Sequence, residues 1–158
     1  MKKTLCFLAV LFSLVAFTSC DSEEELPDVN FKVEIEGGVF SHNTIYVARG
    51  GTIDIKRVDV INNEHGKGVT IPYVNYYFDN QFIGVSPVAP YNFEIELPDS
   101  IAVGMHSLQL TAPVYAVDKT PGYAIVSYGV MVVENPESLP SDNDSSATVE
   151  AHMVEPVR

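Results

Sequence analysis

Apolar and polar residues alternate with a period of two in several short stretches of the chain. The clearest stretches are 31–35, 53–56, 91–97 and 106–110. This period is typical of β-strands that have one buried face and one solvated face. Turn-forming pairs of glycine, asparagine and proline separate the stretches, and no convincing helical period occurs between residues 29 and 135. The pattern predicts an all-β fold, an antiparallel β-sandwich of about seven strands.

A hairpin is predicted around Asp79 and Asn80, because both residue types tolerate the positive φ angles of a two-residue turn. The register that follows has three pairs: Phe78 with Gln81, Tyr77 with Phe82, and Tyr76 with Ile83. Side chains alternate between the two faces of a strand. We therefore expect the Tyr76 pair to point into the core and the Tyr77 pair to point to the opposite face.

In the stretch 123–133, both sets of alternate residues are largely apolar. One set of alternate residues comprises Ala124, Val126, Tyr128, Val130 and Val132, and the other includes Tyr123, Ile125 and Met131. A two-layer sandwich buries only one face of each strand. The second set must therefore contact something else, unless a bulge near Gly129 exchanges the two faces. The candidate residues of a binding face are Tyr77, Phe82, Ile125 and Met131.

The first residues have the three zones of a secretory signal peptide. Lys2 and Lys3 are basic, residues 5–17 are almost wholly apolar, and Thr18 and Ser19 are small. The apolar run is shorter than the roughly 20 residues that a membrane-spanning helix needs. A cleaved signal is therefore preferred over the alternative, a retained transmembrane anchor.

A cysteine directly follows this apolar run. Thr18, Ser19 and Cys20 resemble a lipobox, the site at which bacterial lipoproteins are lipidated and cleaved, and Phe17 departs from the more usual leucine. The resemblance implies a signal peptide of residues 1–19 and a lipidated Cys20 as the first residue of the mature chain. Each buried methylene contributes about 0.8 kcal/mol, and two or more acyl chains anchor a protein stably.

Acidic residues come next, and they have two interpretations. The run consists of Asp21, Ser22, Glu23, Glu24 and Glu25. Such a segment repels itself and cannot pack in a core, so that it would serve as a solvated tether. It also resembles the acidic export signal of Bacteroidota surface lipoproteins, which implies an outer-membrane protein facing the cell exterior. In enteric-type sorting, an aspartate after the lipidated cysteine instead directs retention in the inner membrane.

Charge and cysteine content limit the classes of partner and cofactor. The formal net charge is −12, and loss of Lys2 and Lys3 with the signal peptide lowers it to −14. Such a chain repels phosphate backbones, so nucleic acid is not an expected partner and the lipid is the expected membrane contact. Cys6 leaves with the signal peptide and Cys20 carries the lipid. We therefore expect no intrachain disulfide and no cysteine-ligated metal.

The central part of the chain resembles a known domain family. The residues that carry the resemblance are Val74, Tyr76, Tyr77, Asp79, Ile83, Gly84, Ser86, Ala89, Pro90, Tyr91, Phe93, Gly104, His106 and Leu108. They resemble the bacterial Ig-like domains that are appended to many secreted and surface proteins, and Asn80 departs from the usual glycine of the turn. The resemblance implies an Ig-like sandwich with strands A, B and E facing C, C′, F and G. It also implies that His106 is a corner residue that bonds the backbone.

Residue patterns for catalysis or metal binding are weak. Glu94 and Glu96 lie two residues apart, as an acid and base pair could, but this spacing is also that of the wet face of a strand. Ser86 follows Gly84 and lacks the second glycine of a nucleophile elbow. No pair of histidines has metal-ligand spacing. We therefore expect no catalytic residue, no metal site, no cofactor and no enzymatic activity.

One short motif concerns modification. Asp99, Ser100 and Ile101 resemble the O-glycosylation acceptor of Bacteroidota, with Ser100 as the modified residue. The alternative is an ordinary loop between two strands.

Composition divides the chain into four parts. These are a signal peptide over 1–19, a lipidated acidic tether over 20–28, an Ig-like sandwich over 29–135 and an acidic tail over 136–158 that is expected to be disordered. The favoured function is that of a cell-surface lipoprotein whose non-catalytic domain binds a protein, adheres or self-associates. The alternative is a glycan-binding accessory of a polysaccharide uptake system, which eight tyrosines favour and the absence of tryptophan disfavours.

Overall fold

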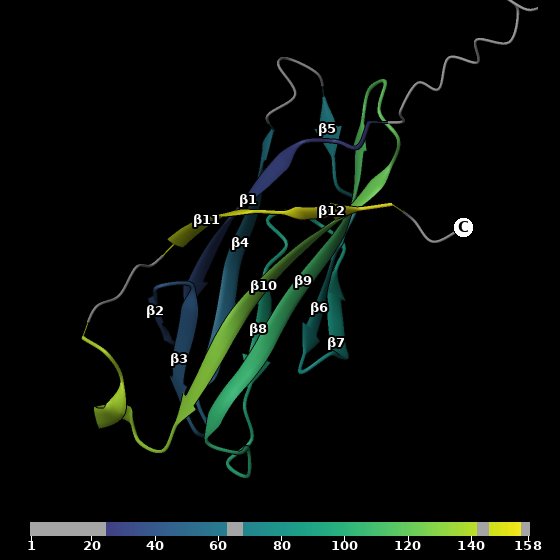
Figure 1. The fold of residues 1–158 in the computed structure, drawn as a ribbon. Helices are drawn as coiled ribbons and strands as arrows, with labels where there is room; N and C mark the ends of the chain where they lie inside the picture. The colour runs from purple at the N-terminus through teal and green to yellow at the C-terminus, as the bar shows by residue number, and fades with distance from the viewer. Residues whose placement is uncertain (1–24, 63–67, 142–145, 156–158) are drawn as a thin grey trace, which may run out of the picture.

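Two β-sheets packed face to face make up the computed structural model of the chain (Figure 1), which describes residues 25–62, 68–141 and 146–155. The strands are β1 (Val29–Glu36), β2 (Val39–Ser41), β3 (Thr44–Ala48), β4 (Thr52–Asn62), β5 (Val69–Thr70), β6 (Val74–Phe78), β7 (Gln81–Ser86), β8 (Phe93–Glu96), β9 (Gly104–Ala116), β10 (Gly122–Val133), β11 (Ser146–Glu150) and β12 (His152–Val154). A short 3₁₀ turn, η1, spans Pro136–Ser138. The predicted all-β sandwich is confirmed.

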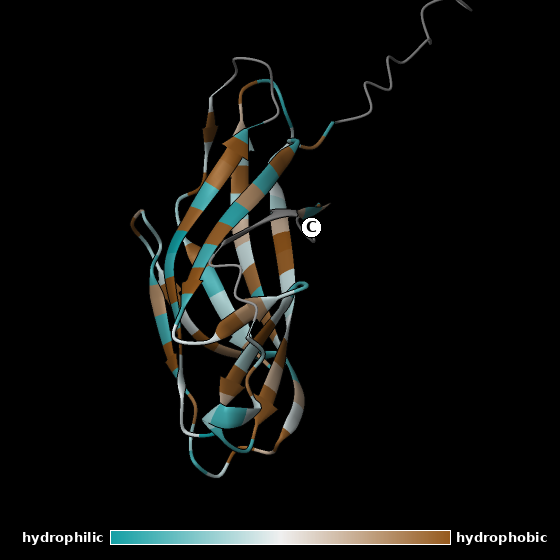
Figure 2. Cartoon of the chain, turned by 90° about the vertical axis from the view of Figure 1, so that its left-hand side faces the viewer, coloured by the Kyte–Doolittle hydropathy of each residue, from teal (hydrophilic) through white to brown (hydrophobic). Residues whose placement is uncertain are grey.

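The smaller sheet has the strand order β11-β1-β4-β8, and all its pairings are antiparallel. In β1, the apolar residues Phe31, Val33 and Ile35 are buried and the intervening charged residues are exposed. Figure 2 shows this alternation of hydrophobic and hydrophilic residues along the strands. The period of two read from the sequence therefore identifies the core face of this sheet.

The larger sheet has the order β2-β3-β10-β9-β6-β7, with β12 beside β10 and β5 beside β9. Its antiparallel strands β10, β9, β6 and β7 correspond to Ig strands G, F, C and C′, and β3 runs parallel to β10. The opposing sheet contains A, B and E as β1, β4 and β8. The protein is therefore an Ig-like sandwich, and short strands that the hydrophobic pattern did not predict extend both of its sheets: β2, β3, β5, β11 and β12.

Strand β10 keeps its two faces along its whole length. The set predicted to face the core is buried: Ala124, Val126, Tyr128, Val130 and Val132. The pairing of β10 with β9 continues through Gly129 without a register shift. The bulge that would have exchanged the faces is therefore not there, and the second apolar set does lie on the outer side of the sheet.

The hairpin of β6 and β7 confirms the predicted turn and corrects one pair. Asp79 and Asn80 have φ angles of 48° and 62°. Tyr77 pairs with Phe82 and Phe78 with Gln81, as predicted, but a bulge shifts the register so that Tyr76 pairs with Gly84. Ile83 is therefore exposed rather than buried, and its expected place in the core is wrong.

A tertiary contact explains this shift. A Cβ atom at Gly84 would lie 2.4 Å from Cε2 of Phe93, so only glycine lets the Phe93 ring reach β7. That ring stacks on Tyr76 with a centroid distance of 4.5 Å and an interplanar angle of 6°. The bulge thus brings the residue without a side chain, rather than Ile83, under Phe93.

The C-terminal segment also differs from the expectation of disorder over 136–158, which is wrong for residues 146–154. Strand β11 pairs with β1 of the smaller sheet, and β12 pairs with the Tyr123–Ile125 end of β10 in the larger sheet. Ala151, which connects the two strands, is buried. Composition indicates whether side chains can form a core, whereas this segment is held by main-chain pairing at two free strand edges.

Candidate functional site

The outer side of the larger sheet carries the candidate binding residues. Pairings across β10, β9, β6 and β7 define two complete rows of side chains on this side. The first row is Ile125, Thr111, Asn75 and Val85, and the second is Ser127, Gln109, Tyr77 and Phe82. A further row begins with Tyr123 and Pro113, and Tyr73 continues it because it lies two residues before Asn75. We call these three rows, together with Tyr115 on β9, the aromatic face.

Two of the four sequence-predicted residues form a direct contact. The rings of Tyr77 and Phe82 meet edge to face at 5.6 Å and 66°. Tyr77 is half-buried, whereas Phe82 is 59% exposed. Ile125 lies in the neighbouring row and is half-buried. The structure therefore brings Tyr77, Phe82 and Ile125 onto one continuous surface, as predicted.

Met131 lies apart from this surface. It is six residues beyond Ile125 on β10, which corresponds to about 20 Å along a strand, and it pairs with Met105 and Tyr46. Met131 shares the outer side of the sheet with the other three candidates but not their neighbourhood. We therefore leave it out of the aromatic face.

Three tyrosines of the aromatic face were not identified as a group from the sequence. Burial raises the pKa of Tyr73, and the neighbouring phenols of Tyr123, Tyr115 and Tyr77 raise it further. Tyr73 also forms a side-chain hydrogen bond with Tyr123. Tyr73 lies one residue before β6, and the period of two extended to it would have placed it on the same side as Tyr77, four positions further along the chain.

Charged side chains avoid this face. Strands β6, β7, β9 and β10 contain no Asp, Glu, Lys or Arg, and His106 is their one residue that titrates near neutral pH. The residues between the aromatic rings are instead neutral and polar: Asn75, Gln109, Thr111 and Ser127. These four strands can therefore offer ring faces, amides and hydroxyl groups to a ligand, but no Asp, Glu, Lys or Arg side chain; at their border, the exposed His152 of β12 pairs with Ile125.

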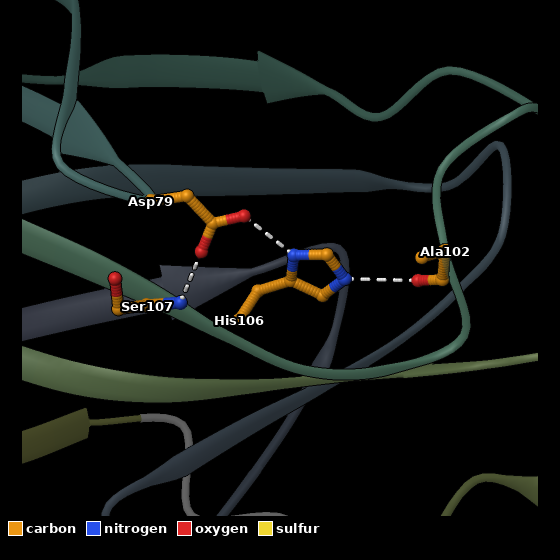
Figure 3. A network of polar contacts seen from close by, with 4 residues as sticks. All are labelled: Asp79, Ala102, His106 and Ser107. Atoms are coloured by element: carbon orange, nitrogen blue, oxygen red, sulfur yellow. Dashed lines mark hydrogen bonds and ion pairs between the residues drawn. The ribbon is translucent and has the colours of Figure 1, made fainter.

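His106 and Asp79 fix the hairpin turn at the other end of β6 (Figure 3). Nδ1 of His106 lies 2.6 Å from Oδ2 of Asp79, and Nε2 lies 2.8 Å from the carbonyl oxygen of Ala102. The second carboxylate oxygen of Asp79 accepts a hydrogen bond of 2.9 Å from the Ser107 amide. The predicted backbone contact of His106 is confirmed, and the sequence interpretation missed its bond to Asp79.

Both ring nitrogens of His106 face groups that only accept hydrogen bonds. The two bonds form together only when both nitrogens carry a proton, that is, in the imidazolium form. The hydrogen bond to Asp79, followed by that to Ala102, accordingly raises the pKa of His106. Partial burial acts to raise the pKa of Asp79, but its bonds with His106 and Ser107 outweigh this effect and lower it.

The residues considered for chemistry lie elsewhere. Glu94 and Glu96 are exposed on β8, on the wet side of the smaller sheet. Ser86 is buried at the end of β7, and Ser100 is exposed in the turn before β9. Within the described residues, no group of three or more His, Cys, Asp or Glu side chains is placed to hold a metal ion.

Most of the predicted anchor and export residues, Cys20 and 21–24, lie outside the described part of the chain. The exception is Glu25, whose Oε2 atom lies 2.6 Å from Nζ of Lys119. Its carbonyl oxygen accepts a bond of 3.2 Å from the amide of Thr120. This acidic residue therefore contacts the β9–β10 connection through its side chain and its main chain, while its side chain stays 80% exposed. Among the described residues, no helix is long and apolar enough to cross a bilayer.

Comparisons with known proteins give a limited result. No protein-family model matches the chain, and no curated protein matches it. Among solved structures, the fibronectin(III)-like modules of Clostridium thermocellum CbhA align with 17% identity and a TM-score of 0.42. The alignment covers 69% of this chain and 48% of that one, so this chain spans about half the length of the matched structure.

Proposed function

We propose that the protein is a lipid-anchored, outer-membrane lipoprotein that faces the cell exterior, and that its Ig-like domain is a non-catalytic module that binds a macromolecule through the aromatic face. The observation that carries the proposal is the uncharged character of four adjacent strands that also expose aromatic rings. Exposed aromatic rings on an uncharged surface of this kind mark interaction sites in soluble domains.

Exposure of the rings supports this interpretation. Phe82 is 59% exposed, Tyr115 is 49% exposed, and Val85, on the same strand as Phe82, is 47% exposed. Covering such side chains gains roughly 25 cal/mol for each Å² of apolar surface removed from water. Tyrosine also offers a hydroxyl group to the partner and loses few rotamers on binding. A partner that covers the face therefore gains hydrophobic contact and hydrogen bonds together.

The anchor determines where the face would lie. Glu25 is held at the β9–β10 connection, which joins the strand of Tyr115 to that of Tyr123. Glu25 is five positions after Cys20, and five residue steps of extended chain reach at most about 18 Å. If Cys20 carries the lipid, the tyrosine end of the aromatic face stays close to the membrane surface. Glu25 thus has a structural role in addition to any role in export.

Replacing the anchor cysteine tests the location. Cys20→Ala should release the protein from the membrane fraction, because the acyl chains are its proposed attachment. Membrane sedimentation after a high-salt wash measures the effect, and protease treatment of intact cells expressing the unchanged protein reports surface exposure. A variant that still sediments with membranes would contradict the lipid anchor.

Photo-crosslinking in living cells tests the binding face while the partner is still unidentified. A benzophenone amino acid inserts into C–H bonds of peptides and sugars alike. Placed at Phe82, it should give products of higher mass, whereas at Glu94, on the exposed side of the opposite sheet, it should not. Equal labelling from both positions, or labelling from Glu94 alone, would overturn the proposal.

A further inference from the structure

We infer that the ligand of the aromatic face is a neutral polysaccharide chain, with its sugar rings stacked on Tyr73, Tyr77, Phe82 and Tyr123. The inference rests on the proposed function, because it names the chemical class of the partner for the same surface. A protein partner, including a second copy of this chain, is the outcome against which the experiment below decides.

The chemistry of the face matches that of a sugar ring. A pyranose has faces made of C–H bonds and a rim of hydroxyl groups. Aromatic rings contact the C–H faces, and side-chain amides and hydroxyls bond to the rim. On the aromatic face, Asn75 and Thr111 lie in the row between the Tyr73–Tyr123 pair and Tyr77, and Gln109 lies beside Tyr77. Each aromatic group therefore has a neutral hydrogen-bonding side chain as its neighbour.

A protein interface would be expected to look different. Protein–protein interfaces have a contiguous apolar centre and a charged rim that steers the partner and sets its orientation. Here, amide and hydroxyl side chains separate the rings, and the four strands supply no charged side chain apart from His106 at the distal turn. This arrangement is better suited to a ligand that is polar but uncharged.

The charge of the chain further limits the chemical class of the ligand. The chain has a formal net charge of −12, and the face supplies no lysine or arginine to offset it. Polymers that carry carboxylate or sulfate groups would be repelled by the domain and would find no counter-charge on the face. The ligand is therefore a neutral polysaccharide rather than a uronate-rich or sulfated one.

Spacing indicates a chain rather than a single sugar. Tyr73, one residue before β6, and Tyr77, within β6, are four positions apart, which corresponds to about 13 Å of extended chain. A single sugar ring cannot contact both. The rings are also partly preset, because Tyr73 is hydrogen-bonded to Tyr123 and Tyr77 contacts Phe82 edge to face. Such fixed rings lower the entropic cost of binding an extended chain.

Affinity electrophoresis of the full-length chain in mild detergent tests the inference. The gels contain a β-glucan, a xylan, a galactomannan or starch as neutral polymers, and polygalacturonate as the acidic one. At least one neutral polymer should retard the protein, and polygalacturonate should not. The Tyr77→Ala, Phe82→Ala variant should bind that polymer at least tenfold more weakly. The matched control is Glu94→Ala, Glu96→Ala on the opposite sheet, which should bind as the unchanged protein does.

Two further measurements keep the experiment decisive. Thermal melting of both variants separates loss of binding from loss of fold, and a variant that has unfolded is replaced by Gln109→Ala, which removes one amide from the face. Retardation by polygalacturonate alone, or by no polymer at all, overturns the inference. If benzophenone at Phe82 then still labels a protein, the proposed function stands and the partner is a protein. If it labels nothing, the proposed function fails as well.

Discussion

The two outer faces of this sandwich are made by the same strand geometry and have opposite chemistry. The smaller sheet exposes charged residues at nearly every outward position of its long strands: Lys32, Glu34, Glu36, Asp54, Lys56, Glu94 and Glu96. The larger sheet exposes tyrosine, phenylalanine, amide and hydroxyl side chains, and its adjacent strands β10, β9, β6 and β7 have no Asp, Glu, Lys or Arg. Solvation alone therefore explains the first face and not the second.

Local interactions on the charged face confirm its solvated character. Lys56 forms an ion pair with Asp54 and lies 3.5 Å from a carboxylate oxygen of Glu36. Such exposed pairs contribute little to stability because water screens them, and a face of this kind discourages association. In a two-sheet domain, the outward residues of one sheet therefore indicate a function when they are uncharged and those of the other sheet are charged.

The largest loss of stability is expected on truncation of Tyr76, the core-facing neighbour of Tyr77 on β6. Tyr76 is fully buried and donates a hydrogen bond to the carbonyl of Tyr91, whereas its neighbour Tyr77 lies on the aromatic face. Tyr76→Ala should cost about 3–5 kcal/mol of stability, by analogy with truncation of a buried phenylalanine. Tyr77→Ala should leave the melting temperature nearly unchanged. Urea denaturation of both variants would contradict the assignment of faces if the two losses were equal.

A smaller effect should follow from closing the space under Phe93. Gly84→Ala places a methyl group where the Phe93 ring now lies, so that the ring must move off Tyr76. Overpacking of this kind costs about 1–3 kcal/mol. Phe93→Leu, combined with Gly84→Ala, should recover part of the loss, because the smaller side chain leaves room. If Gly84→Ala alone is neutral by chemical denaturation, the bulge does not depend on this contact.

The sequence predicted the strand faces better than it predicted the contacts between them. Period-two alternation located the core side of β1, and the Asp79 turn defined the hairpin. Ile83 was misplaced because the register also depends on Phe93, which is distant in sequence from the turn and lies on the other sheet. The tail strands escaped prediction because main-chain pairing leaves little trace in composition. Local sequence patterns therefore indicate which side of the sheet a residue faces, whereas its contact partners depend on residues elsewhere in the fold.

The same limit applies to the candidate site. Tyr77 and Phe82 were predicted as a pair because the turn sets their register. Tyr115 lies beyond the alternating stretch that marked its strand, so its neighbourhood with Tyr73 was not visible. Asp79 was interpreted only as a turn former, although its carboxylate also binds His106. When a residue has both a local role and a long-range contact, as Asp79 does, the sequence pattern indicates only the local role.

The stability of the fold is expected to depend on pH through His106 and Asp79, the pair that fixes the turn between β6 and β7. The folded pKa of His106 is raised above its ordinary value of 6.5, so its contribution is present below that pH and is lost as pH rises through the folded value. The folded pKa of Asp79 is lowered below 3.8, so its contribution is present above that pH and is lost as pH falls through the folded value. The pair should therefore stabilise the fold most between about pH 4 and 6.5.

A double-mutant cycle measures this contribution. His106→Gln, Asp79→Asn and the combined variant should give a coupling free energy of at most about 1 kcal/mol at pH 5.5, because Asp79 is partly exposed. The coupling should be smaller at pH 9, because its ionic part is lost as pH rises through the raised pKa of His106. A coupling that is the same at both pH values would show that hydrogen bonding without charge accounts for the pair.

The smallest change in stability, and the sharpest test of the comparison, comes from placing the same charge on each face. Glu94 pairs with Asp54, which pairs with Glu36, so three acids lie in one row of the charged face. Glu94→Lys should relieve this repulsion and raise stability by up to about 0.5 kcal/mol, with no effect on ligand binding. Gln109→Lys puts the charge in the middle of the aromatic face, where its effect on stability should also stay within about 0.5 kcal/mol. Binding, in contrast, should fall at least tenfold, because the ammonium group must lose water without gaining a counter-charge. If both lysine variants bind equally well, the uncharged character of the aromatic face has no role in recognition.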